Sequence, residues 1–462
     1  MSLTFPPKLA VARATGALSR RTGRGGGTTL PGRLLLRLAP DAMGRLAGRL
    51  TGGTTIVSAT NGKTTTAGMI ASALRSAGRA PVHNRAGSNM SWGVATALLE
   101  QDGEEGLFEV DEAWLPAIAA DIDPRLIVLG NLFRDQLDRY GELERLADEW
   151  GRLVAERAGS TTFALNADDP LVADAGRDRE LRRRRGVVYF GIEDRSAALP
   201  ELQHAHDAKH CRRCGAAYSY EAAFVGHLGH YRCPACGATR PKPDVAATRV
   251  ELRGMQGSRV EVATPEGKVE LRLPLPGLYN VYNALAALAA ARELGLSATQ
   301  AAAGIATTHA AFGRVETIEV GGVPVSILLI KNPAGANEVL RTLRLEWERD
   351  DDEKRLDLWL ALNDRIADGR DVSWIWDADF ELLEPIAGRI VCAGTRAPEM
   401  AVRLKYAGID LDRIDVRGPI DESLDLAVAQ AERRVFALPT YTALIELRRL
   451  LARRGLAAEF WQ

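Results

Sequence analysis

The chain has 462 residues, of which 46% are hydrophobic and 26% are charged, and its formal net charge is −1. This length is sufficient for two or three domains, each with its own core. A near-neutral globular composition argues against the class of dedicated nucleic-acid binders, which are usually basic.

Residues 1–45 are predicted to form a basic N-terminal lead-in. Residues 1–50 contain nine lysines and arginines and a single acidic residue, Asp41. The plainer interpretation is a solvated, partly helical segment, and the alternative is weak attraction to an anionic membrane face. No apolar run there is long enough for a secretion signal or a membrane span. We therefore expect a cytoplasmic protein, with peripheral contact at the inner face of the membrane as an additional expectation.

Short apolar strands alternate with amphipathic helices in the next part of the chain. This alternation is typical of a mainly parallel sheet with helices on its faces. It is interrupted at 204–240 by clustered histidines, cysteines and tyrosines. The expected elements are strands at 54–59, 126–131, 161–166 and 186–191 and helices at 62–78 and 279–295.

A second alternating block begins near residue 315. We therefore place a domain boundary at 312–320, and we find no internal repeats. Its expected strands are 323–330, 356–362, 389–394 and 434–439.

The stretch SATNGKTTT, residues 58–66, has the composition of a phosphate-binding loop. Gly62 lets the backbone turn closely around a phosphate, Lys63 supplies a positive charge, and the Thr64 hydroxyl can bind Mg²⁺. The loop lies between an expected strand and an expected helix, whose N-terminus favours anions. A standard loop of this kind would have glycine at position 57, where this chain has Val57.

This loop resembles that of the Mur ligase and folylpolyglutamate synthase superfamily, which reads G-T-N-G-K-[ST]. Further similar stretches follow in order: EVDEA, NLFRDQLDRYG, LNADDP, GLYNVYNALAA, GRVE and KNPAGANEVL. The resemblance implies an ATP-dependent ligase that phosphorylates a carboxylate and joins the acyl phosphate to an amine. It implies Mg²⁺ binding by Thr64 and Glu109, and ATP binding by Asn61, Gly62, Lys63, Thr64, Thr65, Asn166, Asn280 and Arg314.

The chain also departs from that superfamily. Many of its members use a carbamylated lysine near a second metal, yet no lysine occurs between Lys63 and Lys209. Only about 50 residues precede the loop, so we expect no counterpart of the N-terminal UDP-binding domain that many of these ligases have. A first Mg²⁺ site is expected, and a second is left open.

Four cysteines form the spacing C-x₂-C-x₁₈-C-x₂-C: Cys211, Cys214, Cys233 and Cys236. This spacing predicts four thiolates around a structural Zn²⁺, with no open position for catalysis. The strand–helix alternation and the resemblance to Mur ligases together imply an α/β fold class. A Mur-ligase-type ATPase domain occupies 46–314 with a zinc ribbon inserted at about 204–240, and a Rossmann-like α/β domain occupies 315–462.

An aspartate-rich stretch with two tryptophans, LNDRIADGRDVSWIWDADFE, follows the expected strand at 356–362. Its plainer interpretation is a solvated loop, and its alternative is a docking surface. With the ribbon and IKNPAG, it resembles the synthetase subunits of lipid II isoglutaminyl synthases over nearly the whole chain. That resemblance implies amidation of the D-glutamate α-carboxyl in the lipid II stem peptide to D-isoglutamine. It also implies a GatD-type class I glutaminase partner, whose Cys–His pair Asp371 would complete in a heterodimer.

Two other functions remain open at this point. One is a stand-alone Mur-type amino-acid ligase, and the other is a zinc-ribbon ATPase that binds nucleic acid. The ribbon segment lacks a dense basic and aromatic face, so we expect no nucleic-acid partner.

Overall fold

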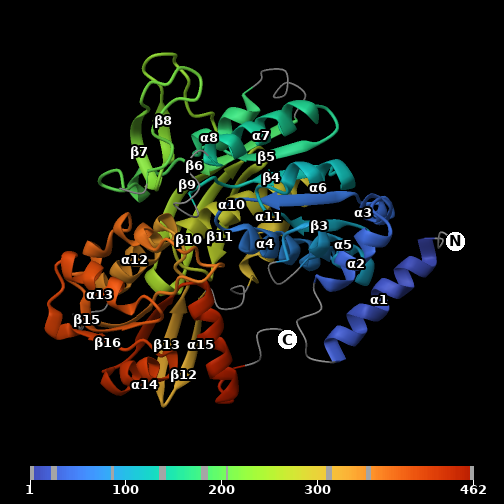
Figure 1. Ribbon diagram of the computed structural model, residues 1–462. Coiled ribbons are helices and arrows are strands. Elements are labelled where there is room, and N and C mark those ends of the chain that lie inside the picture. The colour runs from blue at the N-terminus through green and yellow to red at the C-terminus, as the bar shows by residue number, and fades with distance from the viewer. Residues whose placement is uncertain are drawn as a thin grey trace.

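The computed structural model of the chain contains two α/β units and a small two-stranded hairpin (Figure 1). Figure 1 shows the second unit beside β10 (Ser258–Thr264) and β11 (Gly267–Leu273), the last two strands of the first unit in chain order. It also shows the hairpin projecting from the first unit. The structure describes residues 5–21, 29–84, 88–134, 142–177, 186–203, 206–308, 315–349 and 355–457.

The first unit is built on a nine-stranded sheet with the order β11-β10-β9-β6-β5-β4-β1-β3-β2. Every pair of neighbouring strands from β9 to β2 in this order is parallel. The predicted mainly parallel sheet is therefore confirmed. The antiparallel pairs β9–β10 and β10–β11 were not predicted. The strands are β1 (Thr54–Ser58), β2 (Val82–His83), β3 (Gly106–Glu109), β4 (Leu126–Leu129), β5 (Thr162–Asn166), β6 (Val187–Ile192), β9 (Val245–Leu252), β10 (Ser258–Thr264) and β11 (Gly267–Leu273).

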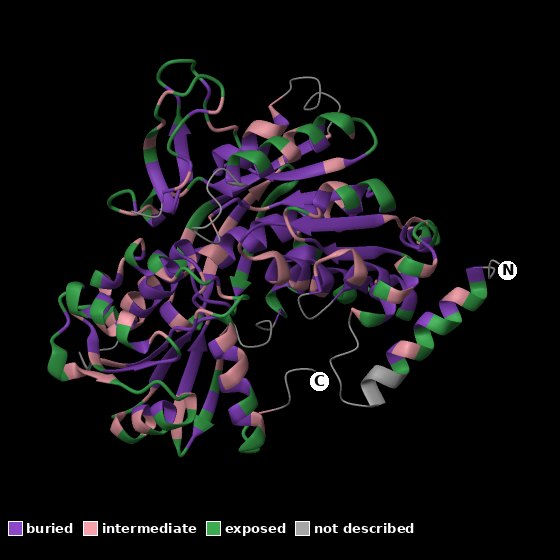
Figure 2. Cartoon of the chain, viewed as in Figure 1, coloured by how far each residue is buried: buried purple, intermediate pink, exposed green. Residues whose placement is uncertain are grey.

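Helices cover both faces of this sheet, which is why its central strands are apolar on both sides. Alternate residues of β1 belong to different cores: Val57 packs with α4, α10 and α11, and Ile56 packs with α3, α5 and α6. The central strands are buried throughout, as Figure 2 shows. The helices are α3 (Ala42–Ala47), α4 (Lys63–Ser76), α5 (Ser91–Glu100), α6 (Leu115–Ile122), α7 (Glu142–Glu156), α8 (Pro170–Ala173), α10 (Leu278–Glu293) and α11 (Ala298–Ala306).

The N-terminal lead-in is more ordered than a solvated segment. It contains helices α1 (Phe5–Arg21) and α2 (Leu30–Leu38), followed by α3. Phe5, Leu9 and Ala12 are buried in the core of the first unit because they recur on one face of α1. No helix in the described ranges combines the length and the apolar character that a bilayer crossing requires.

The hairpin of β7 (Ser219–Val225) and β8 (Leu228–Arg232) lies between β6 and β9 in the chain. It falls inside the segment predicted as a ribbon insertion. Single-turn helices η1 (Asp174–Gly176), η2 (Arg195–Ala197) and η3 (Gly254–Gln256) complete the first unit.

The second unit is a six-stranded sheet with the order β12-β13-β17-β14-β15-β16. Only β12 is antiparallel to its neighbour. The strands are β12 (Val315–Val320), β13 (Val323–Leu328), β14 (Leu356–Ala361), β15 (Ala387–Ala393), β16 (Ile414–Val416) and β17 (Val435–Pro439). The helices are α12 (Pro333–Glu348), α13 (Ala397–Tyr406), α14 (Ile420–Gln430), α15 (Tyr441–Arg453), η4 (Ser373–Trp376), η5 (Phe380–Leu383) and η6 (Leu411–Arg413).

Candidate active site

The predicted phosphate-binding loop joins β1 to α4. Gly62 ends the loop with a φ of 90°, in the left-handed region. A Cβ at this position would lie 2.0 Å from Asn283 Oδ1 on α10, so only glycine fits. Helix α4 begins directly after Gly62. The N-terminus of this helix, which favours anions, therefore lies at the loop.

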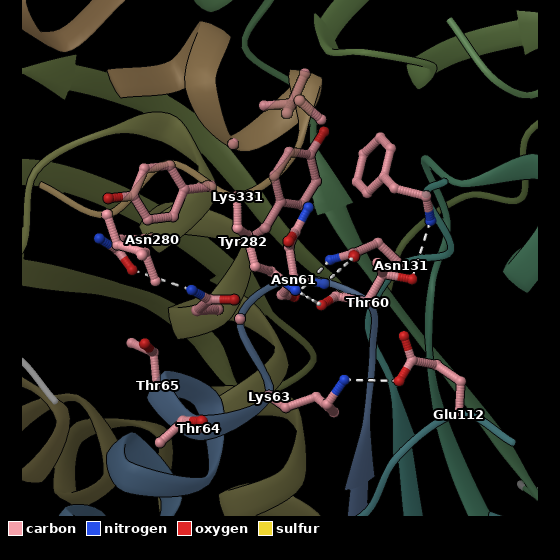
Figure 3. Close-up of a pocket in the computed structure, with 18 of the residues that line it drawn as sticks. Thr60, Asn61, Lys63, Thr64, Thr65, Glu112, Asn131, Asn280, Tyr282 and Lys331 are labelled. Carbon is pink, nitrogen blue, oxygen red and sulfur yellow. Dashed lines mark hydrogen bonds and ion pairs between the residues drawn. The ribbon is translucent and has the colours of Figure 1, made fainter. Parts of the chain in front are cut away.

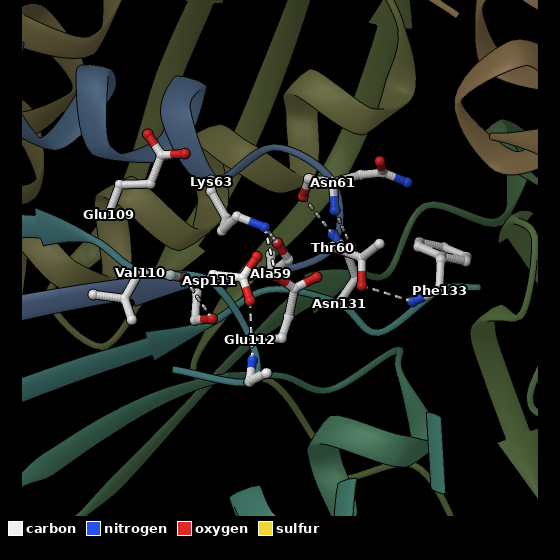
Figure 4. Close-up of polar contacts among 12 residues, drawn as sticks. Ala59, Thr60, Asn61, Lys63, Glu109, Val110, Asp111, Glu112, Asn131 and Phe133 are labelled. Carbon is white, nitrogen blue, oxygen red and sulfur yellow. Dashed lines mark hydrogen bonds and ion pairs between the residues drawn. The ribbon is translucent and has the colours of Figure 1, made fainter. Parts of the chain in front are cut away.

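Lys63 is held at the centre of the loop by two oxygen atoms (Figure 4). Its Nζ donates to the Ala59 carbonyl oxygen at 2.5 Å and to Glu112 Oε2 at 2.7 Å. Burial acts to lower the pKa of Lys63, but Glu112, followed by Glu109 and Asp111, outweighs burial and raises it. The lysine is therefore charged at neutral pH.

The two residues expected to bind Mg²⁺ lie against each other. Thr64 Oγ1 donates to Glu109 Oε1 at 2.9 Å. Glu109 ends β3, and buried Asn84 fixes its backbone by accepting from its N–H and donating to its carbonyl oxygen. A hydroxyl and a carboxylate oxygen are ligands that suit Mg²⁺, so the donor set fits this ion.

A polar clamp of Asn61, Asn131, Lys331 and Asn332 connects the loop to both units. Asn131, after β4, accepts from Asn61 N and donates to Asn61 O, both at 2.9 Å. From the second unit, the Asn332 amide faces the Asn61 amide, with N–O distances of 3.1 and 3.4 Å. Lys331 Nζ lies 3.4 Å from the Thr60 carbonyl oxygen. The second unit thus contacts the phosphate-binding loop directly.

A cavity of about 410 Å³ opens above the loop (Figure 3). Both units contribute to its walls, since Lys331, Val339, Ala367 and Tyr441 come from the second unit. Its volume lies in the range of small-molecule sites. The predicted site residues that line it are Asn61, Gly62, Lys63, Thr64, Thr65, Glu109 and Asn280.

Among the predicted nucleotide-binding residues that the structure describes, Asn166 does not line the cavity. Asn166 is fully buried at the end of β5, where its Oδ1 accepts from Asp168 N and forms the turn that follows the strand. Arg314 lies outside the described residues. Conversely, Glu112, Asn131 and Lys331 line the cavity but were not predicted as site residues, although all three stand in the motifs EVDEA, NLFRDQLDRYG and KNPAGANEVL.

The four predicted metal-binding cysteines form one cluster. Their Sγ atoms all lie within 4.8 Å of one another, with 3.6 Å between Cys211 and Cys236 and 3.4 Å between Cys214 and Cys233. Four thiolates at Zn–S distances of 2.3 Å in a tetrahedron would be about 3.8 Å apart, so the cluster fits zinc. None of the four forms a disulfide.

The hairpin next to this cluster contributes to the cavity. Val225 and Leu228, at the turn between β7 and β8, line it together with Phe133. The ring of His227, in the same turn, lies 4.6 Å from the Phe133 ring and is fully buried. Loss of the ribbon fold would therefore disturb a wall of the cavity.

We predict that Cys211→Ser removes bound zinc and lowers the melting temperature, because metal binding and local folding are coupled. Elemental analysis of the wild type should give one zinc per chain. Cys392→Ser is the matched control: this thiol is buried in β15, outside the cluster, and its loss should leave zinc content unchanged. A stable, zinc-free wild-type protein would refute the assignment.

The aspartate-rich stretch forms the loop from β14 to η5 in the second unit. Asp364 binds Thr395 and Arg396, and Asp368 binds Thr442. Asp377 lies 3.7 Å from Arg134. Each of these three carboxylates is thus engaged with other elements of the chain.

Asp371 differs from these three aspartates. It is exposed, and its hydrogen bonds within the described part of the chain come from Ser373, whose N lies 2.8 Å from Asp371 Oδ1. These bonds hold the pKa of Asp371 below its ordinary value, so the group is an anion at neutral pH. Of the two tryptophans nearby, Trp374 is buried and Trp376 is 50% exposed.

The fold, the phosphate-binding loop and the inter-unit cavity together define a Mur-type ligase. Residues 57–232 match the family model of the Mur ligase middle domain, and residues 329–444 match that of the MurT ligase C-terminal region. The chain belongs to the MurT family, and it is a ligase of peptidoglycan synthesis.

Curated relatives support this membership over nearly the full length. The chain is 32% identical over 460 residues to a Streptococcus pneumoniae protein described as "Lipid II isoglutaminyl synthase (glutamine-hydrolyzing) subunit MurT", with 98% of both chains covered. It is 30% identical over 444 residues to the protein of the same description from Staphylococcus aureus strain N315, with 94% of both covered.

Solved structures share the fold at low sequence identity. A pseudomurein peptide ligase type C from Methanothermus fervidus superimposes with a TM-score of 0.65 and 22% identity, covering 89% of this chain and 80% of that one. MurF from Acinetobacter baumannii gives 0.64 and 19%, covering 91% and 80%. These comparisons confirm the predicted fold class.

Proposed function

We propose that this chain is the synthetase subunit of a lipid II isoglutaminyl synthase. It would amidate the α-carboxyl of D-glutamate in the lipid II stem peptide, using ATP and ammonia from a GatD-type glutaminase. Similarity over nearly the full length to two proteins described as MurT subunits supports this reaction. The observation that carries the proposal is the cavity that Lys63, Thr64 and Glu109 line together with residues of the second unit.

The first half of the reaction transfers the γ-phosphoryl group of ATP to the substrate carboxylate. Lys63 and the N–H groups at the start of α4 would neutralise charge on the β- and γ-phosphates as it develops. Mg²⁺, when bound between Thr64 and Glu109, would screen the same oxygens. The products are ADP and an acyl phosphate.

The second half requires ammonia and the absence of water. Ammonia attacks the acyl carbon, the C–O bond to phosphate breaks, and the nitrogen loses one proton, which yields the amide and inorganic phosphate. An acyl phosphate would also react with water, so the site must be enclosed. Contacts of Lys331 and Asn332 with the phosphate-binding loop hold the second unit against one side of the cavity.

Ammonia would enter from the side of the loop that follows β14. Ala367 of this loop lines the cavity, whereas Asp371 of the same loop is exposed. A glutaminase that used Asp371 to orient its catalytic histidine would therefore dock on a loop that also lines the ligase cavity. This arrangement supports the proposed heterodimer.

We predict that Glu109→Ala raises the Mg²⁺ concentration needed for turnover, because one of the two proposed ligands is lost. Phosphate release should be measured at limiting and saturating Mg²⁺. Glu104→Ala, at an exposed position just before β3, is the control and should behave as wild type. An unchanged Mg²⁺ dependence in Glu109→Ala would exclude it as a ligand.

Reconstitution with the glutaminase tests the proposed function as a whole. The purified pair should release phosphate only with ATP, lipid II and glutamine or ammonium, and mass spectrometry should show conversion of a carboxyl to an amide. A stand-alone ligase would instead add an amino acid to the stem peptide. Phosphate release stimulated by DNA or RNA would indicate the nucleic-acid alternative.

A further inference from the structure

Charge is divided unequally along this chain. Residues 1–50 carry nine lysines and arginines and one acid, a net charge of +8, whereas the whole chain carries −1. Residues 51–462 therefore carry −9. The positive end of the molecule coincides with helices α1, α2 and α3, which lie at one edge of the first unit (Figure 1).

Helix α1 is apolar on two opposite faces. Its inner face, which includes Phe5, Leu9 and Ala12, is buried in the first unit. Its outer face is also apolar, although every residue on it is exposed (Figure 2). The outer face consists of Pro7, Ala10, Val11, Ala14 and Ala17.

Cations border this outer face. Lys8 and Arg13 lie on its two flanks, since helical geometry places them between the inner and outer faces. The helix contains no acidic residue. A helix with an apolar outer face and basic flanks presents the two kinds of side chain that a membrane interface binds.

The neighbouring helices α2 and α3 carry further exposed cations. Arg33 and Arg37 of α2 are exposed, and Leu30 at the start of α2 is 51% exposed. Arg45 of α3 stacks on the Phe5 ring, with its guanidinium carbon 3.6 Å from the ring centroid, and is also exposed. Arg45 therefore lies at the N-terminal end of α1, beside the inner-face residue Phe5.

We infer that α1 and α2 form a docking surface for an anionic phospholipid bilayer. In such a bilayer, acyl chains would contact the apolar outer face of α1, and negative headgroups would contact its cations. A nucleic acid would engage the cations but would leave the apolar face in water, because its affinity comes mainly from phosphate contacts. A second copy of the chain would bring like charges together.

This inference rests on the proposed function and extends it, because an enzyme with a lipid-linked substrate binds that substrate at a membrane surface. Its test needs neither ATP nor lipid II, so its failure would be distinguishable from failure of the ligase proposal. The full-length chain is mixed with vesicles of phosphatidylcholine containing phosphatidylglycerol, or of phosphatidylcholine alone, and binding is measured by flotation. We expect binding to the anionic vesicles that weakens with added salt.

The variant Ala10→Glu/Ala14→Glu places two charges on the outer face without touching the inner face. It should reduce partitioning onto anionic vesicles by about tenfold or more. Glutamate favours helix, so the fold should persist, as circular dichroism can verify. The control Ala303→Glu/Ala306→Glu adds the same charges at exposed positions of α11 and should bind as wild type does.

A second variant, Arg33→Glu/Arg37→Glu, tests the cations on α2 independently and should also lose binding. The inference is overturned if the wild type ignores anionic vesicles, or if both variants bind as the control does. It is also overturned if sedimentation shows that Ala10→Glu/Ala14→Glu separates a dimer of the wild type, since the outer face would then be covered by a second copy.

Discussion

Lys63→Ala should abolish amidation with free ammonium as well as with glutamine. The lysine acts on the phosphates of ATP before any nitrogen source is needed, so both sources must fail together. In the structure its Nζ lies within the phosphate-binding loop and bonds to Ala59 O and Glu112. Removing such an electrostatic group typically costs on the order of 10²-fold or more in rate. Phosphate release at saturating ATP and lipid II measures the effect.

Glu112→Gln is the matched control for this prediction. It removes the same ion pair but leaves the charge of Lys63 in the cavity, and it should retain ATP binding. Melting temperatures of both variants separate loss of the pair from loss of the charge. If Lys63→Ala kept near wild-type turnover with ammonium, the loop would not be the phosphate site.

Local chemistry could be predicted from the sequence because neighbouring residues determine it. The strand, loop and helix at 54–78 are specified by β-branched residues, Gly62 and an amphipathic segment, and the structure has them as β1 and α4. The four cysteines occur as two C-x₂-C pairs, and this spacing predicted the cluster that the structure shows. In both cases the decisive contacts lie within a few residues, or within one hairpin.

Contacts between distant segments could not be predicted in the same way. Asn61 meets Asn131 and Asn332, which are separated from it by 70 and 271 residues, respectively. Asn131 and Asn332 stand in two of the quoted motifs, but a local motif does not indicate which distant residues it will contact. Strands β10 and β11 were not predicted, although their alternation of polar and apolar residues is typical of half-buried strands. Their place in the sheet depends on pairing, since β10 pairs with β9 and β11 pairs with β10.

The choice among the aspartates after β14 also required the structure. Sequence spacing left Asp364, Asp368, Asp371 and Asp377 equivalent, and only family resemblance favoured Asp371. The described contacts separate them, because three are engaged with other elements, whereas Asp371 bonds only to its neighbour Ser373. A carboxylate that serves a partner protein should be exposed and ionised, and Asp371 is both.

Asp371→Asn should therefore stop glutamine-driven amidation while ammonium-driven amidation survives. The asparagine keeps an Oδ1 that can accept from Ser373 N, so the loop should retain its shape. What it loses is the negative charge that would orient and stabilise the partner's imidazolium. Loss of a triad carboxylate can cost up to roughly 10⁴-fold, with smaller losses where other groups fix the histidine. Turnover with each nitrogen source, measured on the reconstituted pair, gives the ratio that tests this.

Asp364→Asn is the control because it removes a charge from the same loop at a position engaged with Arg396. It should change turnover with glutamine and with ammonium by the same factor, whatever that factor is. Binding of the glutaminase to both variants must be intact, since loss of docking would also favour ammonium over glutamine. Equal loss with both nitrogen sources in Asp371→Asn would place Asp371 in the ligase site or in the fold. Wild-type turnover with both would make it a solvated loop residue, and the partner's histidine would then need another orienting group.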